Sequence, residues 1–188
     1  MRIDSRTVPH IAVDEQIPGI RALLTFRPET AGPLAALANE LLHAPNSLTA
    51  GERELIAARV SALNDCTFCF RSHAAIAACH YEDEALVEAA VEDPWETSLS
   101  PKMKALLALA GRVQQSGRAV RAEDIARARA KGATDLEIHD TVLIAAAFCM
   151  FNRYVDGLGA VTPTDPAAYR ERAALTARDG YAMSRPTE

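Results

Sequence analysis

The sequence predicts an all-α protein, and three observations support this fold class. Apolar residues recur at the spacing of three and four that one face of a helix requires, and no segment alternates with the period of two that is typical of a strand. Apolar residues make up 49% of the sequence and aromatic residues only 5%, with alanine the dominant apolar type. This composition favours helices that pack closely together. Helix-capping signals stand at the starts of several periodic segments.

The first part of the chain is expected to be irregular. Prolines and a glycine at positions 9, 18, 19 and 28 interrupt residues 1–30, which predicts an N-terminal arm. A single helical domain is expected over 31–177, followed by a polar tail over 178–188. Within the domain, apolar residues at helical spacing predict a first helix over 33–43.

Two consecutive helices follow and form a hairpin. Thr49-Ala-Gly-Glu52 is a capping box, in which a hydroxyl accepts from an early amide and a carboxylate reaches back to the cap. It opens a helix that is expected to end near Leu63. Asn64-Asp65 offers a stop and a new N-cap, so the next helix is expected from Cys66 to about Cys79.

The second half of the chain carries similar signals. Further helices are expected over 83–91, 101–116, 121–131, 135–156 and 166–177. Thr134-Asp-Leu-Glu137 is a second capping box. The segments Leu48–Ala57 and Leu99–Ala108 resemble each other, which indicates a weak internal duplication. The long apolar helix over 135–156 offers more apolar surface than a lone bundle covers, so we expect a homo-oligomer.

Length and charge limit the classes of function. A chain of 188 residues builds a sizeable core, and a net charge of −5 leaves no basic surplus to neutralise nucleic-acid phosphates. No apolar run approaches the roughly 18–20 residues that cross a bilayer, and Met1 to Glu15 lacks the apolar segment of a secretory signal. We therefore expect a cytoplasmic protein that binds neither nucleic acid nor membrane. In that compartment the four cysteines are not a structural disulfide framework.

Three residues with reactive side chains share one helix face. Cys66, Cys69 and His73 stand at i, i+3 and i+7, so the cysteines can reach each other and His73 follows Cys69 by one turn. An imidazole there can accept or relay the thiol proton. The helix dipole and unpaired amides acidify a thiol in the first turn, which favours Cys66 as the more acidic cysteine.

Glu54 is expected to join this group. It lies ten residues before the Asn64-Asp65 corner, and His73 lies nine residues after Asn64. At about 1.5 Å per residue both stand about 14–15 Å from the corner, hence side by side on paired helices. A carboxylate beside the imidazole would orient it and raise its basicity.

The combined spacing Glu-x11-Cys-x2-Cys-x3-His resembles the AhpD-like alkylhydroperoxidase (peroxidase-related) branch of the carboxymuconolactone decarboxylase family. The resemblance covers residues 17–160 and includes the segments Pro18–Leu24, Leu48–Ile56 and Asn152–Gly159. It implies an AhpD-like helical bundle that assembles as a homo-oligomer, often a trimer or hexamer. It also implies reduction of organic hydroperoxides with no metal, haem or flavin cofactor, the enzyme being restored by a lipoyl-type or thioredoxin-like dithiol.

Residue roles follow from the same resemblance. Cys69 would attack the peroxide, Cys66 would resolve the product to a disulfide, and Glu54 with His73 would form the proton relay. Phe68 stands where the archetypal enzyme has a histidine before the second cysteine, and it cannot move a proton.

Other interpretations of the motif remain open. The two cysteines are also consistent with core filler, and Cys79 and Cys149 are expected to be inert core residues. Zinc bound by Cys66, Cys69, His73 and His80 would need ligands from one helix face, which splays them along the axis. A lyase like the decarboxylase that names the family, or a redox-sensing helical oligomer without turnover, are the alternative functions.

Overall fold

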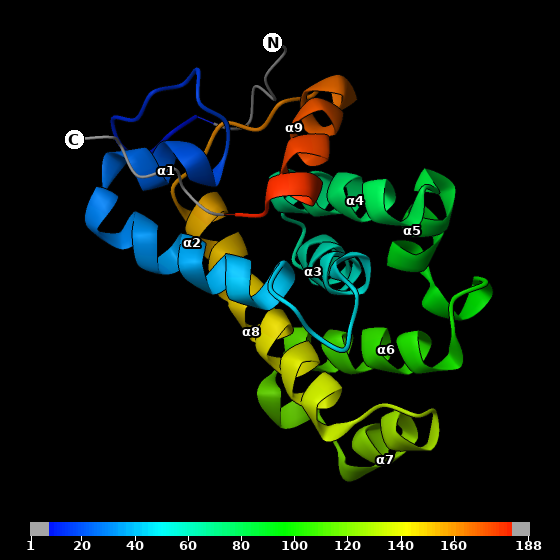
Figure 1. Cartoon of the computed structure of the whole chain (residues 1–188). Helices are drawn as coiled ribbons and strands as arrows, with labels where there is room; N and C mark the ends of the chain where they lie inside the picture. The colour runs from blue at the N-terminus through cyan, green and yellow to red at the C-terminus, as the bar shows by residue number, and fades with distance from the viewer. Residues whose placement is uncertain (1–7, 182–188) are drawn as a thin grey trace.

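The computed structural model describes residues 8–181 and confirms the all-α fold (Figure 1). The described residues form nine α-helices and two short 3₁₀ helices, with no strand among them. In chain order, the first five helices are α1 (Ile20–Phe26), α2 (Pro28–Leu42), α3 (Ala50–Leu63), α4 (Thr67–Tyr81) and α5 (Glu84–Glu92). They are followed by η1 (Pro94–Glu96), α6 (Pro101–Gln115), η2 (Gly117–Ala119), α7 (Ala122–Ala130), α8 (Asp135–Gly157) and α9 (Pro166–Asp179).

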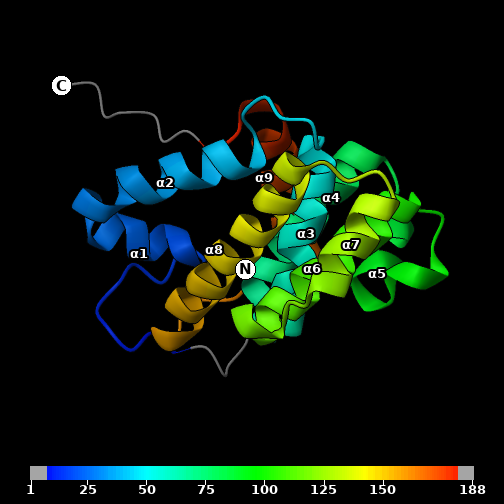
Figure 2. The ribbon, with the colours of Figure 1, turned by 90° about the horizontal axis from the view of Figure 1, so that it is seen from below.

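Helix α3 lies at the centre of the bundle and packs against α4, α6 and α8. Its apolar side chains are fully buried around most of its circumference, as expected for a helix with no face toward water (Leu55, Ile56, Ala57, Ala58 and Val60). At the start of α3, Gly51 lies against His80 of α4, where an added Cβ would be 2.8 Å from the His80 Cβ, so the two helices approach closely there. Figure 2 shows α8 running between the α1–α2 pair and the remaining helices.

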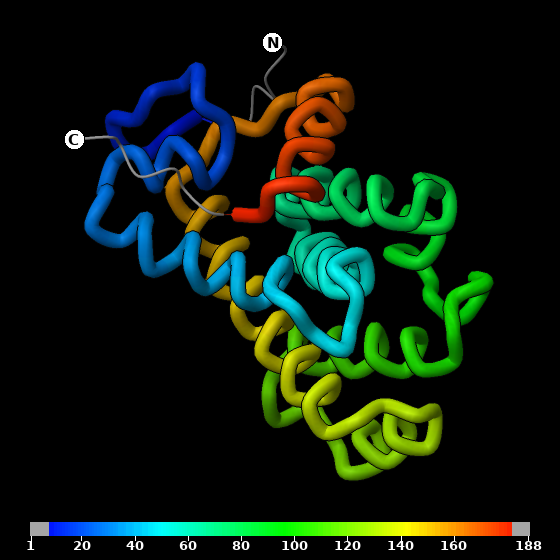
Figure 3. The backbone as a smooth tube through the Cα atoms, in the orientation of Figure 1, coloured from blue at the N-terminus to red at the C-terminus, as the bar shows by residue number. Residues whose placement is uncertain are grey.

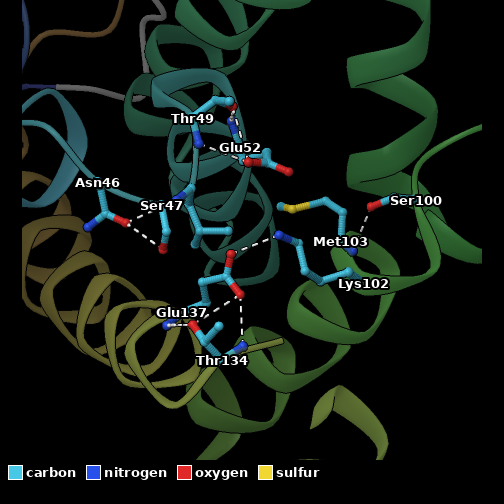
Figure 4. Close-up of polar contacts among 10 residues, drawn as sticks. Asn46, Ser47, Thr49, Glu52, Ser100, Lys102, Met103, Thr134 and Glu137 are labelled. Atoms are coloured by element: carbon cyan, nitrogen blue, oxygen red, sulfur yellow. Dashed lines mark hydrogen bonds and ion pairs between the residues drawn. The ribbon is translucent and has the colours of Figure 1, made fainter. Parts of the chain in front are cut away.

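The predicted capping boxes are present at both helix starts (Figure 4). At α3 the Thr49 amide donates to Glu52 Oε2 at 2.8 Å and the Glu52 amide donates to Thr49 Oγ1 at 3.2 Å. At α8 the Thr134 amide donates to Glu137 Oε2, also at 2.8 Å. Lys102 Nζ at the start of α6 reaches Glu137 Oε1 at 2.7 Å, so these two helix starts are tied together.

The N-terminal part is more helical than the sequence predicted. Residues 20–26 form α1, and α2 begins at Pro28 instead of residue 33. Pro28 occupies the first turn of α2, where a missing amide costs nothing. Pro33 lies inside α2 and removes one backbone hydrogen bond, yet the helix continues because Ala31 and Ala35 on either side are buried.

The C-terminal part also departs from its expectation. Helix α9 packs on α4 and ends at Asp179, two residues beyond the predicted end. Beyond it, the chain runs toward α2, as the red end of the tube in Figure 3 shows, and the Tyr181 amide donates to Asn39 Oδ1 at 3.0 Å. Residues 178–181 therefore belong to the packed body, while 182–188 lie outside the described residues. None of the helices within 8–181 is long and apolar enough to cross a membrane.

Candidate active site

The corner between α3 and α4 differs from the predicted cap. Asp65 takes a left-handed conformation with φ of 57°, and Cys66, not Asp65, is the N-cap residue of α4. The Asn64 side chain instead donates to Asn152 Oδ1 at 2.8 Å, and Asn152 Nδ2 donates to Ser61 Oγ at 3.0 Å. The corner residue thus anchors the hairpin to α8, a tertiary role that local sequence patterns do not reveal.

The two motif cysteines are buried side by side. Cys66 is completely buried and Cys69 is 4% exposed, in a small apolar cluster with Leu23, Val155 and Ala160. The Cys66 thiol donates a hydrogen bond to Cys69, which raises the pKa of Cys66 far above its ordinary value. Burial and the negative charges of Cys69 and Asp156 raise it further.

The pKa of Cys66 is raised, whereas the sequence analysis predicted that the helix start would lower it. The prediction was wrong because Cys66 caps the helix from outside its first turn and serves as a hydrogen-bond donor. The hydrogen bond to Cys69 and burial both favour the protonated form of Cys66.

Glu54 and His73 lie side by side across the α3–α4 pair, as the hairpin geometry predicted. His73 Nδ1 stands 2.7 Å from Glu54 Oε2, and Glu54 is only 2% exposed. Phe148 of α8 packs its ring edge-on against the His73 ring, with centroids 4.5 Å apart. A carboxylate oxygen at this distance accepts a proton that Nδ1 carries, which leaves Nε2 as the ring nitrogen outside this hydrogen bond.

Tyr181 is a member of this group that the sequence interpretation missed. Its hydroxyl donates to Glu54 Oε1 at 2.6 Å and lies 3.2 Å from His73 Nδ1. Burial, followed by the negative charge of Glu54, raises the pKa of the Tyr181 phenol well above its ordinary value. The only signal in the sequence was a large aromatic residue directly after Gly180, within a segment expected to be a polar tail.

Apolar side chains cover one side of the cysteine pair. Phe68 packs on Gly19, where an added Cβ would lie 2.0 Å from the ring, so a side chain at position 19 would displace it. The Phe68 ring also lies 6.0 Å from that of Tyr169, whose pKa is raised to about 12, chiefly by burial. Phe68 is thus part of an apolar wall, which fits its inability to relay protons.

The other side of the cysteine pair lies toward a surface pocket. Asp156 lies near Cys66, and burial raises the pKa of its carboxyl group. Asp156 also lines a surface pocket of about 440 Å³ together with Asn64, Asn152, Arg153 and Gly157. This pocket therefore lies on the Asp156 side of the cysteine pair.

The remaining candidate residues do not join the site. Across residues 8–181 no group of three or more His, Cys, Asp or Glu side chains is arranged to hold a metal ion. His80 lies near the far end of α4, against Gly51. Cys79 is exposed, so its prediction as a core residue was wrong because it faces outward on the last turn of α4. Cys149 is half-buried.

Comparison with known proteins finds similarity to one family over part of the chain. Residues 28–110 match the model of the carboxymuconolactone decarboxylase family, and this range contains the motif from Glu54 to His73. No curated protein matches the sequence significantly.

Two solved structures share the fold. One is an alkylhydroperoxidase AhpD core, an uncharacterized peroxidase-related protein from Ralstonia eutropha JMP134, with 26% identity, 82% of each chain covered and a TM-score of 0.74. The other is an uncharacterized peroxidase-related protein from Silicibacter sp. TM1040, with 24% identity, 82% of this chain and 79% of that chain covered, and a TM-score of 0.74. Over residues 28–110 the chain is thus similar to the carboxymuconolactone decarboxylase family, and its fold is that of the AhpD core.

Proposed function

We propose that the chain is a thiol-dependent hydroperoxide reductase in which Cys69 attacks the peroxide and Cys66 resolves the product. The observation that carries the proposal is that Cys66 and Cys69 are buried in one cluster, on the same helix as a His73 that is bonded to Glu54. Of the two cysteines, Cys69 stands one helical turn before His73, and the pKa of Cys66 is raised. The AhpD core from Ralstonia eutropha supports the same class of reaction by its name.

The chemistry balances in two steps. The Cys69 thiolate attacks one peroxide oxygen, an S–O bond forms, the O–O bond breaks and the alkoxide leaves. The organic hydroperoxide is reduced to an alcohol and Cys69 is oxidised to a sulfenic acid. Cys66 then attacks the sulfenic sulfur, so that an S–S bond forms and water leaves with the Cys66 proton.

His73, held by Glu54, transfers the protons in this reaction. Nε2 of His73 takes the proton from Cys69 and returns it to the leaving alkoxide, while Glu54 holds Nδ1 and stabilises the imidazolium. The apolar wall around Phe68 excludes water from the sulfurs, which strengthens these charge interactions. Such proton transfer contributes typically about 10²–10⁴ in rate.

The cycle needs a dithiol partner. A lipoyl-type or thioredoxin-like dithiol attacks the Cys66–Cys69 disulfide through a mixed disulfide and leaves oxidised. The pocket lined by Arg153 and Asp156, next to Cys66, is where we expect this partner to approach. Such a cycle runs in a reducing compartment such as the cytoplasm.

A homo-oligomer, a trimer or hexamer, forms part of the proposal. It is supported by large apolar side chains that lie exposed at seven-residue spacing along α8, namely Leu136, Leu143 and Met150. This spacing places the three apolar side chains on one side of the helix.

A lyase is the second candidate, because the matching family model is named for a decarboxylase. A lyase has no need for a cysteine pair, so its activity would survive replacement of both. A redox sensor without turnover is the third, and it would form the disulfide once without being recycled by any dithiol.

Counting free thiols tests the proposal. Anaerobically reduced protein is titrated before and after one equivalent of cumene hydroperoxide, with Cys66→Ser and Cys69→Ser in parallel. Cys79→Ser is the matched control, since Cys79 is an exposed thiol outside the site. We expect the parent and the Cys79→Ser protein to lose two thiols per chain, and the Cys69→Ser protein to lose none. Unchanged thiol counts in the parent would refute the proposal.

A further inference from the structure

The end of α9 brings one side chain into the relay from outside the matched part of the chain. The family model covers residues 28–110, which include Glu54 and His73 but not Tyr181. Tyr181 nevertheless makes the shorter of the two hydrogen bonds to Glu54, at 2.6 Å against 2.7 Å for His73. Both carboxylate oxygens are therefore occupied, one by each partner.

The backbone around Tyr181 is built for this placement. Gly180 has φ of 74°, and a Cβ there would lie 2.6 Å from Asn39 Oδ1 and 2.7 Å from His43 Cδ2. The Gly180 amide donates to Thr176 O at 2.8 Å, and the Tyr181 amide donates to Asn39 Oδ1 at 3.0 Å. The chain thus turns sharply off α9 and is fixed to α2 immediately before the phenol enters the site.

The contacts of the phenol restrict what it can do. Its ring stacks on that of His73, with centroids 6.1 Å apart and planes 24° apart. Its raised pKa keeps the hydroxyl protonated at neutral pH, so it acts as a donor to Glu54. A buried carboxylate with a donor on each oxygen has one fixed orientation, and Nδ1 of His73 has one fixed acceptor.

We propose that Tyr181 is a positioning residue of the relay, whose hydroxyl locks the Glu54 carboxylate so that His73 presents Nε2 as the base toward Cys69. The expected change in kinetics rests on the proposed function, whereas the expected orientation of Glu54 and His73 does not. Tyr181 acts through Glu54 and His73 and is not assigned contact with the peroxide.

Kinetics supply the first test. In Tyr181→Phe one oxygen of Glu54 loses its donor, and we expect kcat/KM for cumene hydroperoxide to fall about tenfold. The acid limb of the pH profile is expected to move to higher pH, because a carboxylate that no longer shares its charge with the phenol holds the imidazole proton more firmly. Tyr81→Phe is the matched control, since it removes a hydroxyl from a half-buried tyrosine of α4. It should keep both parental values.

A measurement without peroxide separates this inference from the proposed function. Nitrogen-detected NMR of the imidazoles, with His73 assigned through His73→Gln, reports the proton on Nδ1. We expect the parent and Tyr81→Phe to show a strongly hydrogen-bonded Nδ1 proton, and Tyr181→Phe to show a shifted signal that exchanges faster.

The kinetic experiment and the NMR experiment have separate contradicting outcomes. A parent that does not consume peroxide refutes the proposed function, and the NMR comparison still decides the role of Tyr181. A Tyr181→Phe protein with the parental His73 spectrum, or with parental or faster turnover and an unshifted pH profile, overturns the inference. Faster turnover would instead indicate that the phenol obstructs the site.

Discussion

Glu54 and Glu137 are two buried carboxylates in very different surroundings. They are 2% and 3% exposed, and each makes a hydrogen bond of 2.7 Å to a basic side chain. Glu137 accepts hydrogen bonds from the Lys102 ammonium and from the backbone amide of Thr134 at the start of α8 (Figure 4). Glu54 faces an imidazole and a phenol, both of which can give up a proton.

The difference indicates what each carboxylate is for. Burial alone would raise the pKa of Glu137, but hydrogen bonds from Lys102 and Thr134 lower it below its ordinary value. Glu137 is thus held in one charge state and serves to join the starts of α6 and α8. Glu54 has no Lys or Arg hydrogen-bonded to it among the described residues, which is unfavourable for stability alone but suited to a relay.

Exchanging each carboxylate for its amide should separate these roles, and this is the largest expected effect. Glu54→Gln removes the charge that stabilises a His73 imidazolium, so we expect kcat/KM to fall about 100-fold. Glu137→Gln should leave kcat/KM at the parental value. Peroxide consumption under steady-state conditions measures both, and equal losses in the two variants would contradict the comparison.

Stability should respond in the opposite order. Removing the Lys102 partner by Lys102→Met leaves the Glu137 carboxylate buried with fewer donors, which should lower the free energy of unfolding by about 1–2 kcal/mol. The partly exposed ammonium keeps this figure below that of a fully buried pair. Urea unfolding followed by circular dichroism measures it. Lys104→Met is the control and should change stability little, since Lys104 is on the same helix and donates to the Trp95 carbonyl.

The pH dependence of stability sharpens the comparison further. Because the pKa of Glu137 is depressed in the folded protein, its contribution is complete above its unfolded value of about 4.3 and is lost as pH falls through the folded value. The unfolding free energy of the parent should therefore drop more steeply below about pH 4 than that of Lys102→Met. Parallel curves would show that Lys102 does not hold the charge of Glu137.

The smallest effect concerns Glu52, the counterpart of Glu137 at α3, which is half-buried. Glu52 closes the same type of capping box, and no lysine within residues 8–181 is paired with it. Glu52→Ala should cost about 0.5–1 kcal/mol, the usual value for one cap interaction. A larger loss of unfolding free energy than Lys102→Met causes would mean that the capping box, and not the ion pair, contributes most to stability at both helix starts.

Local patterns predicted the parts of the molecule that depend on local physics. The capping boxes, most of the helix boundaries and the pairing of Glu54 with His73 follow from helical periodicity and a hairpin corner. Tyr181 could not be predicted, because it meets Glu54 from 127 residues away through a turn set by packing on α2. The raised pKa of Cys66 was missed for a related reason, since it depends on a side-chain hydrogen bond to Cys69 and on burial in the folded chain.

The corrections elsewhere have similar causes. Helix α1 was missed because prolines at both sides suggested an irregular arm, while the burial of Ala22 and Leu23 stabilises the short helix in the fold. Cys79 was assigned to the core from its alanine-rich neighbours, but the last turn of α4 turns it outward. Burial of a single side chain depends on which neighbours a helix meets, which the sequence alone does not specify.

The central claim, that Cys69 is the sulfur oxidised by peroxide, can be tested by trapping the sulfenic acid. Cys66→Ser protein lacks the resolving thiol, so the intermediate should persist after one equivalent of cumene hydroperoxide and react with dimedone. Peptide mass spectrometry is predicted to find the adduct on Cys69 and not on the exposed Cys79. An adduct confined to Cys79, or a Cys69 recovered as the free thiol, would contradict the account.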